Sequence, residues 1–104
     1  MTFEEFTSAI AQGKPCPNSL PPALQGLWID KQGDWDTAHQ IVQNANDKDS
    51  AWVHAYLHRE EGDIGNARFW YGRAGKPAGQ GSLAQEWEQI AQELLAKVAS
   101  EVGV

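Results

Sequence analysis

The chain contains two copies of one helix-turn-helix unit. The segment 62–75, GDIGNARFWYGRAG, has an earlier counterpart in the segment 33–45, GDWDTAHQIVQNA. The two segments correspond at a constant shift of 29 positions (62 − 33). Periods of this order are typical of stacked helix pairs, in which neighbouring units bury a continuous core. We therefore expect two repeat copies, at about residues 22–46 and 51–75.

The residues common to both copies are of the kinds that end, cap and pack helices. A glycine can end one helix, the aspartate after it can cap the next, and alanines allow two helices to approach closely. These pairs are Gly33 and Gly62, Asp34 and Asp63, Ala38 and Ala67, and Ala45 and Ala74. The pattern predicts two stacked antiparallel helix pairs.

Capping signals and apolar periodicity predict about six helices and no strands. The expected helices cover about residues 3–11, 22–32, 35–44, 51–61, 64–74 and 82–99, with Ser50 as the cap of the fourth. In the last helix, Trp87 and Ile90 fall on the apolar face, whereas Glu86 falls on the polar face. The first and last helices would cap the ends of the stack. The expected fold is all-α, in a single domain over residues 1–104.

The same residues resemble the tetratricopeptide repeat and its Sel-like variant. GDWDTA, residues 33–38, is similar to the turn and second-helix signature of the tetratricopeptide repeat. More loosely, residues 54–75 resemble the core of a group of short bacterial proteins without an assigned function. The resemblance covers residues 22–75 and implies stacked hairpins, with a period that is shortened here to 29 residues. In the Sel-like variant of the repeat, the second helix carries Asp, Ala, Trp-Tyr and Ala, which here are Asp63, Ala67, Trp70, Tyr71 and Ala74.

Charge and cysteine content argue against several functional classes. A net charge of −6 disfavours binding to nucleic acid or to an anionic membrane surface, since both need a surplus of Lys and Arg. The single Cys16 cannot form an internal disulfide, which favours a reducing compartment. The acidic N-terminus lacks the features of a signal peptide, and no apolar run approaches the roughly 20 residues that span a bilayer. We expect a cytoplasmic protein without a cofactor.

Aromatic and arginine side chains are the candidate binding residues, because these types dominate protein-binding hot spots. The tetratricopeptide resemblance places Trp52, Tyr56 and Arg59 on the inner, concave side of the stack. Residues 69–71 are three consecutive aromatics, so at least one ring should remain partly exposed. The full candidate set is Trp52, Tyr56, Arg59, Trp70, Tyr71 and Arg73. The leading hypothesis is a module that binds a protein or peptide partner, and a homo-oligomeric structural protein is another.

Two histidines have the spacing of metal ligands. His54 and His58 are four residues apart on one predicted helix, and Glu61 continues that face, which can place these groups around an ion. A zinc-hydrolase helix would carry Glu directly after the first His, where this chain has Ala55. The first interpretation is therefore histidines that pack between helices, with no catalytic residue. The alternative is a metal-dependent or small-molecule enzyme, in which His39 is a third ligand if the fold brings it near.

Overall fold

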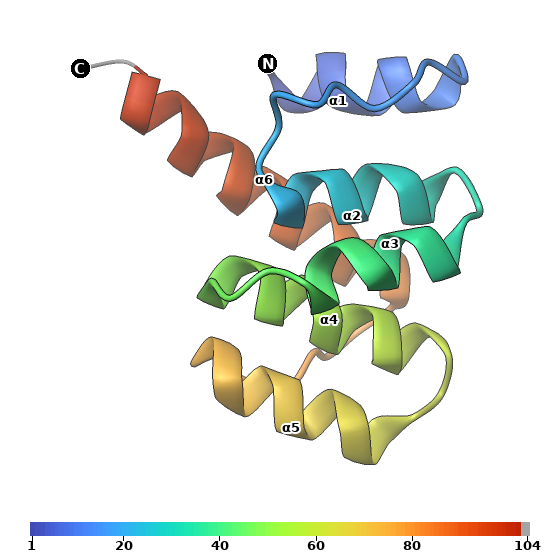
Figure 1. Ribbon diagram of the computed structural model, residues 1–104, viewed down its shortest axis with the longest axis vertical. Coiled ribbons are helices and arrows are strands. Elements are labelled where there is room, and N and C mark those ends of the chain that lie inside the picture. The colour runs from blue at the N-terminus through green and yellow to red at the C-terminus, as the bar shows by residue number, and fades with distance from the viewer. Residues whose placement is uncertain (103–104) are drawn as a thin grey trace.

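The computed structural model describes residues 1–102 and folds them into six α-helices, without a strand among them (Figure 1). The predicted all-α class is confirmed. Only the start of the fourth helix and the end of the sixth extend beyond their expected bounds, by three residues each (51 − 48 and 102 − 99). The helices are α1 (Phe3–Ala11), α2 (Pro22–Lys31), α3 (Trp35–Gln43), α4 (Lys48–Glu60), α5 (Ile64–Ala74) and α6 (Leu83–Val102).

The helices pack as two hairpins crossed by a long C-terminal helix. α2 packs on α3, and α4 packs on α5. α4 also packs on both α2 and α3, which stacks one hairpin on the other (Figure 1). The expected position of α6 at an end of the stack differs from the observed one, because α6 runs across α2 and α4 and reaches α1. As a result α5 lies at the end of the molecule opposite α1, with α4 as its main neighbour.

The turns within the two hairpins are built from the same two residue types. Gly33 and Gly62 adopt φ angles of 96° and 88°, a left-handed region that glycine enters without the steric cost of a side chain. The aspartate that follows each glycine is an N-cap: Asp34 accepts a hydrogen bond from the backbone N–H of residue 37, and Asp63 from that of residue 66. The predicted stops and caps of both repeat copies are confirmed.

Small residues lie where the helices cross most closely. A Cβ added to Gly26 on α2 would lie 2.8 Å from Val42 Cγ1 and 3.3 Å from Val53 Cγ1, so no larger residue fits without movement. Ala38 on α3 and Ala67 on α5 occupy equivalent positions in the two copies and are buried. Close-packed interiors resist added volume, so these positions fix the spacing between helices.

The variant Ala67→Leu tests this packing. The larger side chain should overpack the contact between α5 and α4 and lower the free energy of unfolding by about 1–3 kcal/mol. Urea denaturation followed by circular dichroism measures the change. The matched control is Gly72→Leu on the same helix, where an added Cβ meets no described atom within 4 Å. Equal stability of Ala67→Leu and the native chain would contradict the close contact.

The cap of α4 differs from the prediction. Asp47, not Ser50, is the N-cap, and its carboxylate accepts hydrogen bonds from the backbone N–H of Ser50 at 3.0 Å and from its hydroxyl at 2.7 Å. The helix therefore starts one turn earlier than expected, and Ser50 is completely buried inside its first turn. Both residue types are good caps, and the Asp47 carboxylate offers a separate oxygen to each of the two Ser50 donors.

Glu86 on α6 is buried, although the periodicity of that helix placed it on the polar face. Its carboxylate accepts hydrogen bonds from Arg59 Nη1 at 2.9 Å and from the Tyr71 hydroxyl. Arg59 also donates to the carbonyl oxygen of Gly81, in the loop that precedes α6. Burial, together with the bond to Glu86, raises the pKa of Tyr71, which stays a neutral donor. The prediction was wrong because helical periodicity gives no information about a partner charge supplied by another helix.

Removing the Glu86 carboxylate should strongly destabilise the fold. In Glu86→Ala the Arg59 guanidinium, whose side chain is only 19% exposed, loses its charge partner, and the Tyr71 hydroxyl loses its acceptor. Breaking a buried pair in this way costs about 3 kcal/mol or more. Urea denaturation again provides the measurement, with Glu88→Ala, an exposed position on α6, as the control. A difference of less than about 0.5 kcal/mol between the two variants would show that the pair is not structural.

Candidate functional site

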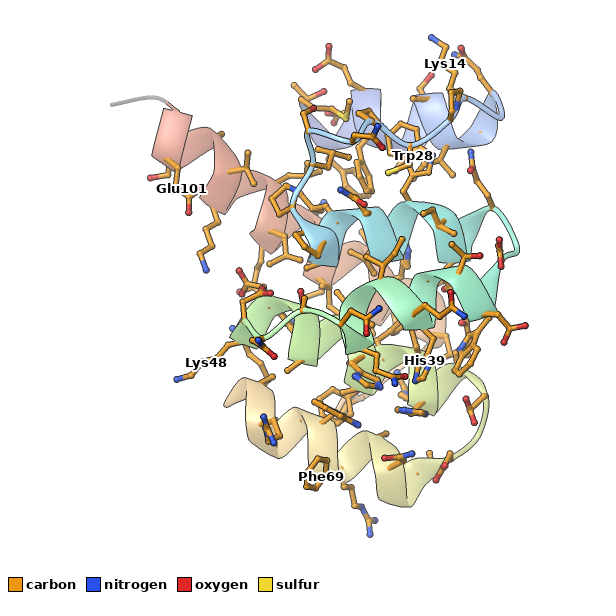
Figure 2. The ribbon with its side chains drawn as sticks, viewed as in Figure 1. Lys14, Trp28, His39, Lys48, Phe69 and Glu101 are labelled. Atoms are coloured by element: carbon orange, nitrogen blue, oxygen red, sulfur yellow. The ribbon has the colours of Figure 1, made fainter. Side chains whose placement is uncertain are left out.

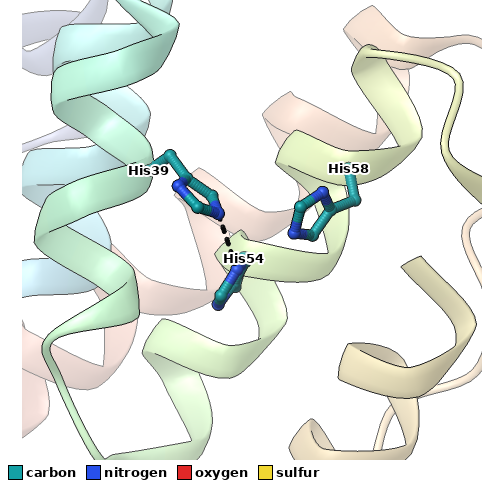
Figure 3. Close-up of side chains that lie close together, drawn as sticks. All are labelled: His39, His54 and His58. Atoms are coloured by element: carbon teal, nitrogen blue, oxygen red, sulfur yellow. Dashed lines mark hydrogen bonds between the residues drawn. The ribbon is translucent and has the colours of Figure 1, made fainter. Parts of the chain in front are cut away.

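All three histidines of the chain come together between the two hairpins (Figure 3). His39 projects from α3, while His54 and His58 project from α4. The Nε2 atoms of His39 and His54 are 3.0 Å apart, a hydrogen bond in which one ring donates and the other accepts. One nitrogen from each of the three rings lies within 4.8 Å of the other two. The fold therefore brings His39 to the pair, the condition that the metal hypothesis required.

The positions of the rings follow from the two helices that carry them. His54 and His58 are one turn apart on α4, and their rings stack with centroids 4.8 Å apart. α3 packs beside α4, which places His39 opposite both of them. The Asp34 cap fixes the start of α3, so the position of His39 along the helix is also fixed.

Two tryptophans enclose the histidine cluster, which we define as His39, His54 and His58. Trp35 stacks on His39 with ring centroids 4.7 Å apart and planes 9° from parallel. Trp70, on α5, stacks on His54 at 3.9 Å and 19°. Trp35 is held in turn by a hydrogen bond from its Nε1 to the carbonyl oxygen of Leu57 at 2.9 Å. The indoles hold two of the imidazole planes in place, and of these two rings His54 is buried while His39 is partly exposed.

The cluster leaves buried polar atoms unsatisfied. Nδ1 of His54 and Nδ1 of His58 are buried and have no hydrogen-bond partner among residues 1–102. Glu61 Oε2 lies 3.5 Å from His58 Nδ1, close enough for an ion pair but not placed as a hydrogen-bond acceptor. An unsatisfied buried polar group costs about 1–3 kcal/mol, so retaining two in one place calls for an explanation.

The electrostatics of the cluster favour neutral rings at His39 and His54. Burial, with smaller contributions from the neighbouring His39 and His58, lowers the pKa of His54 to about 4. Burial and His58 also lower the pKa of His39, against an opposing effect of Glu61 and Asp36. His39 and His54 are therefore unprotonated at pH 7, which is the form of imidazole that binds metal ions.

The low pKa of His54 predicts that the metal-free protein loses stability in acid. Between pH 6.5, the usual value for histidine, and about 4, the unfolded chain binds a proton at this position that the folded chain does not. Stability is thus complete above pH 6.5 and falls as the pH drops toward 4, by up to about 3 kcal/mol for this one group.

Urea denaturation at several pH values between these limits measures the effect. The variant His54→Leu, which cannot take up the proton, should lose less stability than the native chain over the same range. Identical pH dependence of the two proteins would contradict the assignment of the low pKa to His54.

A pair of carboxyl groups lies on the other side of Trp35. Asp30 on α2 is buried, and Glu60 at the end of α4 faces it. Partial desolvation and the neighbouring Asp30 carboxyl group raise the pKa of Glu60 to about 8. The two residues line a surface hollow of about 320 Å³ together with Trp35, Gly33 and Glu61. Neither carboxyl group is part of the histidine cluster.

The six predicted binding residues do not line one open groove. Trp52, Tyr56 and Tyr71 are buried, at 4%, 3% and 4% exposed. α6 and the loop before it cover the face on which the repeat resemblance placed the first two, and they also engage Arg59 through Glu86 and Gly81. Of these side chains, Trp52 lines a surface hollow of about 450 Å³, whose other lining residues come from the loop 76–80 and from α6.

The remaining two candidates lie on α5. Trp70 is partly buried because it covers His54, whereas Arg73 is exposed on the outer side of the helix. The expectation that one ring of residues 69–71 remains exposed is met by Phe69, at 55%.

From the sequence we did not predict that Trp35 and Trp70 stack on the histidines. Trp35 precedes His39 by four residues, and this spacing places the two rings on one face of α3. That signal was present in the sequence. The stacking of Trp70 on His54 depends on how α5 crosses α4, and no spacing within one helix indicates it.

Comparisons with known proteins give no match: no family model, no curated protein and no solved structure is similar to this chain. The resemblance to tetratricopeptide and Sel-like repeats therefore stays a prediction. No helix within residues 1–102 is both long and apolar enough to cross a membrane.

Proposed function

We propose that this protein binds one divalent ion of the late first-row transition metals, with Zn²⁺ as the expected occupant, through His39, His54 and His58. The observation that carries the proposal is the convergence of every histidine of the chain in one place, with nitrogens of all three rings within 4.8 Å of one another.

The spacing of the nitrogens supports the assignment. Zn–N bonds of 2.0–2.1 Å in tetrahedral geometry separate two ligand nitrogens by about 3.3 Å. The 3.0 Å between His39 and His54 is close to that value, and the largest separation in the cluster is within reach of a side-chain adjustment. An ion would replace a marginal hydrogen bond between two rings with two coordinate bonds.

The ligand type narrows the choice of metal. Imidazole nitrogen suits Zn²⁺, Cu²⁺, Ni²⁺ and Co²⁺, whereas Mg²⁺ and Ca²⁺ require oxygen. Around the ligands, Glu61 Oε2 lies 3.5 Å from His58 Nδ1, and Trp35 and Trp70 hold the planes of the other two rings. Outer contacts of this kind orient metal ligands and strengthen binding.

Three neutral histidines leave the charge of the ion uncompensated and a fourth position open. In zinc sites of this type, a water molecule at that position becomes acidic enough to supply hydroxide near neutral pH. The proposal assigns metal binding to the chain and no particular reaction.

Titration of the purified protein, without an affinity tag and after dialysis against a chelator, tests the proposal. Isothermal titration calorimetry should show one Zn²⁺ ion per chain and no binding of Mg²⁺. Zn²⁺ should also raise the melting temperature in a concentration-dependent way, because it binds only the folded form. Affinity should weaken as the pH falls, since protons compete for the same nitrogens.

The variants separate a real site from surface binding. His39→Ala removes a partly exposed ligand and should greatly weaken Zn²⁺ binding while leaving a folded chain. Gln40→Ala, an exposed neighbour on the same helix, should bind Zn²⁺ like the native protein. If the native chain binds Zn²⁺ only weakly and His39→Ala binds it equally well, the proposal is wrong.

Binding of a protein or peptide partner, the role that the repeat resemblance implies, is a second and separate proposal. One observation favours it: Phe69 and Arg73 remain exposed on α5 and lie against each other, with the guanidinium 5.9 Å from the ring centroid. Both are residue types that anchor interfaces.

A cytoplasmic location is part of the proposal. Burial raises the pKa of the single thiol, Cys16, which keeps it protonated and poorly reactive. A lone, unreactive thiol is compatible with a reducing compartment. Cell fractionation with an antibody against the chain tests the location.

A further inference from the structure

Helix α5 has an outer face that no other element within residues 1–102 covers. Its inner face packs on α4 through Ala67, Tyr71 and Ala74, which are buried. On the opposite side Phe69 is 55% exposed, and it lies on the outermost helix of the stack (Figure 2). A ring of this size in solvent is unusual in a chain that buries all five of its tryptophans wholly or partly.

Two glycines flank Phe69 on this outer face. Gly65 precedes it by four residues and Gly72 follows it by three, so all three share one side of the helix. Neither glycine has a positive φ, and a Cβ on either would meet no described atom within 4 Å. Gly65 lies in the first turn of α5 and Gly72 in the last, and glycine has a lower helix propensity than every residue except proline.

Because Gly65 and Gly72 have no side chains, the surface of α5 is low on each side of the projecting Phe69 ring. The ring itself is held in place, because it meets Trp70 edge to face at 5.2 Å and 87°, and Arg73 lies over it. A second helix laid across this face can bring its backbone close at Gly65 and Gly72 and pack its side chains around Phe69. Such close approach of helices is what small residues allow, and an amphipathic helix in a preformed surface is a common mode of recognition.

The charge of the face identifies the chemistry of its partner. α5 carries Arg68 and Arg73 and no acidic residue, a charge of +2, while the whole chain has −6, which leaves −8 for the rest (−6 minus +2). Both arginines are exposed and lie on either side of the glycine and phenylalanine row. Two copies of the chain joined through this face would bring like charges together, whereas carboxylates on a partner would be attracted.

We propose that the outer face of α5 binds an acidic amphipathic helix of another protein, whose apolar side chains pack around Phe69 over Gly65 and Gly72 and whose carboxylates meet Arg68 and Arg73. This surface does not include the histidine cluster, and its test does not depend on metal binding.

A displayed library of amphipathic helical peptides tests the proposal. The apolar stripe is kept constant, the flanking positions vary among Asp, Glu, Lys, Gln and Ser, and the full chain is the bait. Selection should enrich peptides with acidic flanks. Fluorescence anisotropy of one selected peptide should show binding that weakens as salt rises and that falls at least about tenfold in Arg73→Glu.

The double variant Gly65→Leu with Gly72→Leu separates binding from folding. Leucine has the higher helix propensity and meets open space at both positions, so the melting temperature should be equal or higher. Binding of the selected peptide should nevertheless be lost, because the new leucine side chains fill the surface on which the peptide lies. Ala96→Leu, which adds a leucine at an exposed position of α6, should bind like the native chain.

Several outcomes would overturn the proposal. They are a library that yields no binder, enrichment of basic flanks, and a selected peptide whose affinity is unchanged in the double glycine variant. A fourth outcome comes from light scattering. If the native chain is a dimer and the double glycine variant is a monomer, the face binds a second copy of the chain instead.

Discussion

Helix α4 is enclosed by four other helices, and every residue from Ser50 to His58 is buried. A helix buried on all sides is ordinarily apolar on all sides, but this one also carries a serine, a tyrosine and two histidines in that stretch. Each polar group must then find a partner within the protein, because water does not reach it. The positions of α3, α5, α6 and the loop before α6 all bear on how these groups are satisfied.

The buried polar groups of α4 have hydrogen-bond partners on one side of the helix and lack some of them on another. On the side of α6, the Arg59 guanidinium, the Glu86 carboxylate and the Tyr71 hydroxyl satisfy one another, and the network ties α4, α5 and α6 together. On the side of α3, the histidine cluster leaves Nδ1 of His54 and of His58 without partners. A completed network stabilises a fold. In the histidine cluster, the facing Nε2 atoms of His39 and His54 are the ones that the proposed ion would bind, and the two Nδ1 atoms have no partner within residues 1–102.

Much of the architecture could be read from the sequence, because helix ends are determined locally. The shared Gly-Asp turns predicted the two hairpins. Capping signals predicted the starts of α1 and α6, where the structure shows reciprocal hydrogen bonds between Thr2 and Glu5 and between Ser82 and Gln85. Contacts between helices could not be read in the same way. The pair His54 and His58 follows from spacing within one helix, but His39 joins it only through the crossing of α3 and α4. Glu86 was misplaced for the same reason, since its partners come from α4 and α5.

The stacking of Trp70 on His54 makes the histidine cluster observable by tryptophan fluorescence. Indole emission depends on the groups in direct contact with the ring, and this imidazole lies 3.9 Å from it, centroid to centroid. Trp35 has a similar relation to His39. The remaining three tryptophans, Trp28, Trp52 and Trp87, are buried and form no ring pair with a histidine among the described residues, so they form a steady background. The native chain thus carries its own fluorescent reporter of whatever occupies or protonates these two rings.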